Sequence, residues 1–453
     1  MEKEGMERES SSSTVSIRID DLDPTWVVSL NQKIACEPKI LRESSHAASC
    51  CIHRVPQCFR RIDPRAYDPQ IVSIGPFHRG KRSLQAMEEH KWRYLRGMLS
   101  RKGDASLERY LVAVKKLEAK ARDCYSETIH VDSNSFVEMM VVDGCFIVEL
   151  LCKARGLSEV DQSDPIFKMH WIRPLLETDF LLLENQIPFF VLECLFGLME
   201  VYQDGRDRLS LATIAIDFFK DLLPLNHGTI MKKSDPHDHG TLHLLYLFHS
   251  KLLPSSKKAR QSNNIPITMI QCATELQDAG IRFKKRRCEG FLDIKFSHGV
   301  MEIPQITVQG STNYLFLNLA AFEQSNPHCG HQMTTYITFM DCLIGSAKDV
   351  GILCRNRIIE NWLGSESEVA ALFNKLGREV TIEEEGFYLA ELFEQVNRYY
   401  RTDWHAWRAS LVHDYFSNPW ATLSLLAAVI LLALTFVQSF FAAFSYFKPP
   451  PAN

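Results

Sequence analysis

Acidic residues stand inside several otherwise apolar stretches of this chain, at Glu138, Asp143, Asp341 and in the run Glu184-Asn185-Gln186. A buried carboxylate without a partner is costly, so each acid needs a donor, a cation or a route to water. Two carboxylates brought together could act as general acid and base in an enzyme. The same side chains could instead form a hydrogen-bonded network that fixes helix packing. We favour the network because no nucleophile lies near the acids in sequence. Its members would be Asp143, Glu184, Asn185, Gln186 and Asp341.

Motifs of well-known catalytic and metal sites are missing from the sequence. It contains no glycine-rich phosphate loop, kinase catalytic loop, G-x-S-x-G elbow, H-E-x-x-H motif or paired C-x-x-C motif. Histidines gather around His237–His243 and His328–His331, but both segments are polar. A zinc site needs three or four rigidly held ligands, so we interpret both clusters as solvated loops. We therefore expect no catalytic residue, no cofactor and no metal, and we expect that the protein is not an enzyme.

Composition indicates a globular protein and argues against one class of partner. The chain has 453 residues, 46% of them hydrophobic and 23% charged, which suffices for a buried core. Its net charge is -4, from 51 basic and 55 acidic residues. Without an excess of positive charge the protein gains little from releasing counterions, so we expect no nucleic-acid partner.

Hydrophobic spacing predicts a mostly α-helical protein that carries one small antiparallel β-hairpin or sheet. The hairpin is predicted where Leu292, Ile294 and Phe296 alternate with polar residues and Ser297-His298-Gly299 turns the chain toward Val300–Val308. Pro188 should kink or divide the helix that contains it. The predicted helices are 25–41, 83–99, 107–125, 135–152, 180–198, 209–223, 241–253, 269–279, 314–324, 334–354, 369–376 and 387–416.

The segment Leu423–Phe444, within 420–447, predicts a single C-terminal transmembrane helix. It contains no charged residue and is about as long as the roughly 20 apolar residues that a span needs, with Leu431 near its centre. Trp420 and Tyr446 suit the two headgroup layers, so Trp420, Leu423, Leu431, Phe444 and Tyr446 define the expected anchor. A buried core helix is the alternative.

Two other segments offer contacts to lipid headgroups, each with a plainer alternative. Lys284–Arg287 is a basic cluster, which would attract anionic lipid or form a solvated loop. Trp404, Trp407 and Leu411 share one face of the helix before the anchor, which would lie at the membrane surface or pack on the domain.

The sequence predicts a tail-anchored organisation. Residues 1–23 are polar and rich in serine, as in a disordered tail, and contain no signal peptide. An amphipathic helix and linker follow at 24–50, then a helical domain at 51–416, the transmembrane helix at 420–447 and a short tail at 448–453. We expect the membrane to be the plasma membrane or an endomembrane, with the N-terminal domain in the cytosol.

Short motifs follow one another along the chain from about Ile52 to the terminal helix. They are Ile52-His53-Arg54-Val55-Pro56, Tyr67-Asp68-Pro69, Val72–His78, Glu88-Glu89-His90-Lys91, Val142–Phe146, Leu182–Phe189, Ala273-Thr274-Glu275-Leu276, Phe291–Ile294, Ala321–Gln324 and Asp341–Ile344. This series resembles the plant family called domain of unknown function two-four-seven. The resemblance implies a mostly helical domain, a C-terminal membrane span and no known catalytic activity, and some members of that family are linked to self-incompatibility in grasses.

Together these observations favour a membrane-anchored, non-catalytic recognition or signalling protein. Its expected partners are the lipid bilayer and a protein. The alternative is an enzyme of unfamiliar type that uses the carboxylates around Asp143 and Glu184. A water-reachable pocket holding two of these acids would favour the enzyme, whereas acids sealed against arginines or helix ends would favour recognition.

Overall fold

The computed structural model describes residues 23–35, 50–61, 63–101, 107–199, 209–222, 240–253, 266–287, 290–326, 329–378, 386–402 and 419–447. The chain divides into two compact units, Met1–Cys50 and Cys51–Asn453. Several predictions fall outside the described residues, among them those for 1–22, His237, His239, His328, 403–416 and 448–453.

The first unit contains helix α1, Pro24–Ala35. The carboxylate of Asp23 accepts hydrogen bonds from the backbone N–H and the hydroxyl of Thr25, at 2.8 and 2.7 Å, and so supports the start of the helix. No residue of α1 is buried.

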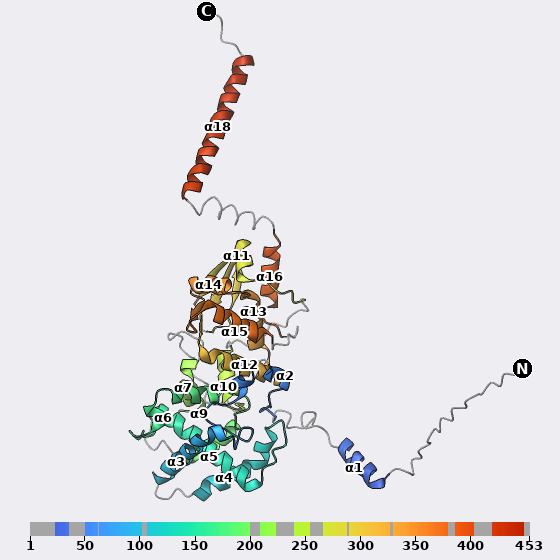
Figure 1. Ribbon diagram of the computed structural model, residues 1–453, viewed down its shortest axis with the longest axis vertical. Helices are drawn as coiled ribbons and strands as arrows, with labels where there is room; N and C mark the ends of the chain where they lie inside the picture. Colours follow the sequence, from blue (N-terminus) through green and yellow to red (C-terminus); the bar gives the residue numbers. More distant parts are fainter. Residues whose placement is uncertain are drawn as a thin grey trace, which may run out of the picture. The chain divides into compact units, whose positions relative to one another are not determined.

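In the second unit, residues 51–253 form a helical group around α5. Figure 1 shows α3, α4 and α5 together at one end of this unit. Helix α5 is buried along most of its length and packs against α3, α4, α8 and α9. The elements of this group are α2 (Gln57–Arg60), η3 (Pro64–Tyr67), η4 (Arg82–Leu84), α3 (Gln85–Ser100), α4 (Leu107–Asp123), α5 (Ser133–Ala154), α6 (Pro165–Lys168), α7 (Ile172–Asp179), α8 (Phe189–Met199), α9 (Leu211–Phe218), η5 (Lys220–Leu222) and α10 (Leu244–Leu252).

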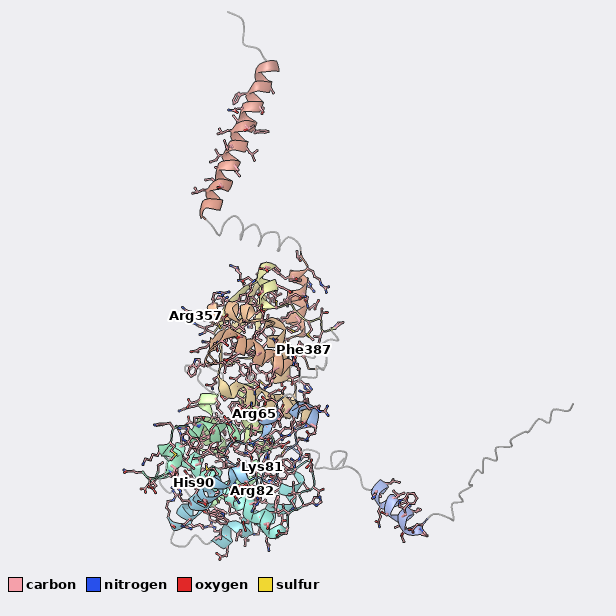
Figure 2. All side chains as sticks on the ribbon, in the orientation of Figure 1. Arg65, Lys81, Arg82, His90, Arg357 and Phe387 are labelled. Carbon is pink, nitrogen blue, oxygen red and sulfur yellow. The ribbon has the colours of Figure 1, made fainter. Side chains whose placement is uncertain are left out.

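The rest of the unit carries the strands and a second group of helices. Helix α12 connects the two groups, because it contacts η3 and α7 as well as α13 and α15. Figure 2 shows Arg357 and Phe387 in this second half, and Lys81, Arg82 and His90 in the first. The helices are α11 (Ala273–Asp278), α12 (Gly310–Ser325), α13 (Gln332–Leu343), α14 (Ala347–Arg355), α15 (Glu366–Gly377) and α16 (Ala390–Tyr400).

The predicted hairpin is confirmed, but the sheet around it is mixed. Strands β2 (Lys295–Ser297) and β3 (Val300–Pro304) pair antiparallel, with positive φ at His298 and Gly299 in the turn. Strand β1 (Arg282–Arg286) pairs parallel with β3. A second sheet pairs β4 (Ile306–Val308) parallel with β5 (Ile359–Asn361). The prediction of a purely antiparallel sheet is wrong because strands distant in sequence add the parallel pairs.

The basic cluster at 284–287 is mostly part of strand β1. Arg286 lies 2.8 Å from Asp293 and 3.0 Å from Glu302, and the amine of Lys284 lies 3.4 Å from Glu302. These charges therefore serve pairing within the sheet.

Two predicted helices differ from those in the structure. Residues 180–188 of the predicted helix 180–198 are not helical, and α8 begins only after Pro188, at Phe189. The predicted helix 334–354 breaks into α13 and α14 around Gly345-Ser346, because Ser346 and Asp349 form a capping box that starts a new helix.

Helix α18 (Pro419–Phe447) occupies the segment for which the sequence predicts a transmembrane span. Across the described residues, no helix is both long enough and apolar enough to cross a bilayer. The predicted C-terminal transmembrane helix is therefore wrong, although the helix-dominated fold is confirmed. Leu423 and Leu431 of the expected anchor are exposed, whereas the side chains of Trp420, Phe444 and Tyr446 are not described.

Candidate functional site

A buried polar network joins the turn after α7 to the extended segment Gln70–Gly75. Asp179, the last residue of α7, is fully buried. Its carboxylate accepts hydrogen bonds from the backbone N–H groups of Gln70, Ile71 and Val72, at 2.8, 2.8 and 3.0 Å. Burial raises the pKa of Asp179 to about 6, against the opposing effect of these hydrogen bonds. The carboxylate thus fixes a segment that belongs to none of the strands described in the structure.

Asn185 and Gln186 complete the connection with their amide groups. The Oδ1 atom of Asn185 accepts from the N–H of Ile74 at 2.7 Å, and its Nδ2 donates to the carbonyls of Val72 and Asp179. The Nε2 atom of Gln186 donates to the carbonyls of Phe180 and Leu182, at 2.7 and 2.8 Å. These bonds satisfy carbonyls in a turn where the chain is not helical.

Glu184 is sealed against an arginine and a backbone donor. Its Oε1 accepts from the N–H of Val55 at 2.7 Å, and its Oε2 lies 2.5 Å from the guanidinium of Arg60 and 3.3 Å from Nε2 of His78. Burial alone would raise the pKa of Glu184, but His78 and Arg60 lower it below its ordinary value. Glu184 is therefore an ionised structural anchor for the segment that begins at Cys51.

Asp143 forms a buried ion pair on α5. Its Oδ1 lies 2.7 Å from the amine of Lys91 on α3, and its Oδ2 accepts from the N–H of Gly75 at 2.8 Å. Lys91 is 1% exposed and also donates to the carbonyl of Ser73. Burial raises the pKa of Asp143, and the charge of Lys91 opposes that shift.

Asp341 does not join this network. It lies on α13, where its carboxylate faces Gly377 at the end of α15, so that a Cβ at that glycine would overlap it. Burial raises its pKa, and Arg378 opposes the shift. Glu138 is half exposed and paired with Arg79, so it is not a buried acid.

Sequence reasoning missed several members of the network, among them Lys91, Asp179 and Asn318. Asn318 on α12 accepts from the N–H of Leu183 at 2.9 Å and donates to the carbonyl of Ala66 at 2.8 Å. Lys91 lies at helical spacing with the buried residues Met87, Tyr94 and Leu95, and that position on an apolar face is a signal the sequence does carry.

The carboxylates of the network are held by backbone N–H groups and by basic side chains of the protein. Asp143, Asp179 and Glu184 each have both carboxylate oxygens occupied by donors from the protein. Within the described ranges no three His, Cys, Asp or Glu side chains are grouped so that they could hold a metal ion.

Comparison with known proteins places these residues in a family. Residues 52–434 match the family model DUF247, described as a plant protein of unknown function. The chain belongs to the DUF247 family. The resemblance drawn from the sequence motifs is thereby confirmed, and Asp143, Glu184 and Asp341 all lie inside the DUF247 match.

Two relatives from Arabidopsis thaliana match nearly the whole chain. UPF0481 protein At3g47200 is 34% identical, over 92% of this chain and 91% of the relative. Putative UPF0481 protein At3g02645 is 24% identical, over 96% of this chain and 97% of the relative. No solved structure matches.

Proposed function

We propose that this chain is a recognition protein that acts through contact with a protein partner and catalyses no reaction. The main support is the state of the three buried acids Asp143, Asp179 and Glu184. They are 3%, 0% and 1% exposed, and protein donors occupy both oxygens of each. A general acid or base must reach the proton that it transfers, directly or through one water. Carboxylates held in this way are suited to fixing the fold.

Two measurements test the proposal on the purified full chain and in plant cells. The chain is incubated with a metabolite extract of plant tissue, and the composition of the extract is followed over time by mass spectrometry. We expect no loss of any metabolite beyond that seen with heat-denatured protein. Proximity labelling by the full chain in plant cells should enrich a defined set of proteins. For the variant Asp143→Asn, we expect enrichment to fall only as far as the amount of folded protein falls.

A metabolite consumed by the wild-type chain but not by folded Asp143→Asn would contradict the proposal. The control is Glu138→Gln, on the same helix, because Glu138 is half exposed and outside the network. This variant should behave as wild type in both measurements.

The enzyme alternative is supported by His78 more than by the acids first considered. His78 is 2% exposed, with Nε2 3.3 Å from Glu184 and Nδ1 3.8 Å from Asp68. Neither ring nitrogen makes a hydrogen bond of normal geometry with the described part of the protein. If the chain were an enzyme that uses this imidazole, His78→Gln would fold and bind partners but lose turnover.

A further inference from the structure

An apolar groove of about 560 Å³ opens between α3, α4 and α5. Its floor is the face of α5 that carries Val137, Val141 and Val142, all buried. Asp143 and Lys91 do not line it, so the groove is separate from the polar network. Its volume lies within the range of roughly 300–1,000 Å³ that is usual for small-molecule sites.

The walls of the groove are apolar because two amphipathic helices both rest on α5. Helix α3 contributes Trp92 and Leu95, and α4 contributes Leu111 and Val112. Trp92 is 44% exposed and Val112 is 53% exposed, so large apolar side chains face solvent on both sides. Apolar surface gathered in a concavity in this way marks a binding site.

One end of the groove is polar and basic. Lys115 and Lys116 of α4 lie there with Asn134, in the first turn of α5. The amine of Lys115 is already paired with Glu118 at 3.0 Å, whereas no ion pair of Lys116 is found among the described residues. Glu138, an acid in the lining, is paired with Arg79 at 3.4 Å. Among the charged residues of the lining, Lys116 is therefore the one for which the described residues provide no ion pair.

We propose that the groove binds a small amphipathic acid, with an aliphatic body on the apolar walls and a carboxylate beside Lys116. The apolar body would replace water along Trp92, Leu111 and Val112, which favours binding in proportion to the area buried. The anionic head would meet the charge of Lys116. This ligand site does not depend on the protein partner proposed above.

Calorimetric titration of the full chain with decanoate tests the proposal, with decyltrimethylammonium as a probe of equal chain length and opposite charge. We expect saturable binding of decanoate to one site and weaker binding of the cation. Lys116→Glu should weaken decanoate binding by about tenfold or more, because it places like charges together. The matched control Lys348→Glu, at an exposed lysine of α14, should leave affinity within about twofold.

A second pair of variants tests the apolar wall. Val112→Glu should weaken binding of decanoate, and Val160→Glu, at an exposed valine outside the groove, should not. Thermal unfolding verifies that the variants fold, which is expected because all four positions are exposed. Absence of saturable decanoate binding would overturn the proposal, as would binding unchanged by both Lys116→Glu and Val112→Glu. If a partner protein crosslinks at Val112 and decanoate does not displace it, the groove is a protein-binding site, and the proposal of a small acid is overturned.

Discussion

At the scale of single residues, the buried ion pair of Lys91 and Asp143 illustrates how this fold uses charge. Both side chains are almost fully buried, and each also binds the extended segment, through Ser73 and Gly75 respectively. Removing Asp143 leaves the buried ammonium of Lys91 with the carboxylate of Glu88, 2.6 Å away and partly exposed, as its counter-charge. The removal also leaves the N–H of Gly75 without its acceptor.

We therefore predict that Asp143→Ala lowers the free energy of unfolding by about 1–3 kcal/mol. The double variant Asp143→Ala with Lys91→Met should recover part of this loss, because the buried ammonium is gone. Glu184→Ala should also destabilise, since it leaves the N–H of Val55 without its acceptor and Arg60 with Asp68 as its remaining carboxylate partner. Chemical denaturation measures the free energy of unfolding of these three variants. Glu138→Ala is the control, and its free energy of unfolding is expected within about 0.5 kcal/mol of wild type. An unchanged stability with lost partner labelling would show that Asp143 serves function instead.

His243 makes stability depend on pH. It is fully buried at the start of α10, where Nδ1 accepts the N–H of Tyr246 and Nε2 lies 3.2 Å from the carbonyl of Cys51. These contacts require the neutral ring with its proton on Nε2. Burial lowers its pKa from 6.5 to about 3. The unfolded chain therefore takes up a proton near pH 6.5 that the folded chain refuses, and stability is lost as pH falls below that value.

We predict that wild-type stability falls relative to His243→Asn by about 2 kcal/mol between pH 7 and pH 5. Asparagine can still accept the N–H at the start of α10 but does not titrate. Urea denaturation of both proteins across this range gives the difference directly. A difference that stays constant with pH would mean that His243 is not held neutral by the fold.

At the scale of elements, the extended segment Gln70–Gly75 is held by side chains rather than by a sheet. Its sharpest constraint is Gly75, which has φ +72° and donates its N–H to Asp143. A Cβ at Gly75 would lie 2.6 Å from the carbonyl oxygen of Gln186. The carbonyl of Gln186 is thus too close to Gly75 for a residue with a Cβ atom to fit there without a shift of the backbone.

Gly75→Ala should cost at least about 2 kcal/mol, from the left-handed conformation and the clash with backbone. Gly80→Ala is the matched control, because Gly80 has φ +83° but nothing within 4 Å of the added atom. It should cost only about 1 kcal/mol. Thermal and chemical unfolding of the two variants separates the cost of the left-handed conformation from the cost of the clash with the Gln186 carbonyl. Equal losses of unfolding free energy in the two variants would show that the segment around Gly75 moves to accommodate the methyl group.

At the scale of the whole molecule, one hydrophobic core extends through the second unit. Its buried residues run from Cys51 to Val396, and none of the described residues of α18 belongs to it. We predict that a chain ending after Thr402 unfolds at the same temperature as the full chain, within about 2 °C. Differential scanning calorimetry of both chains checks this. A large loss of stability would show that the segment after Thr402 contributes to the core.

The sequence by itself determined most of the helices, because apolar residues repeat at helical spacing and caps are local signals. Ser365 caps α15, Gly280 with φ +88° follows the end of α11, and Pro188 directly precedes α8. The hairpin at 295–304 follows equally from alternation and a turn. The sequence also identified Asp143, Glu184, Asn185 and Gln186 as polar residues in need of partners.

Only the tertiary structure decided what those partners are. Glu184 meets Val55 and Arg60 across more than one hundred residues of chain, and such pairings leave no periodic signal. The parallel pairing of β1 with β3, and of β4 with β5, is non-local for the same reason. Asp341 lies on an apolar helix as Asp143 does, yet it faces Gly377 and stays outside the network. Residue type and spacing predict that a buried acid needs a partner, whereas the packing of distant segments decides which one it finds.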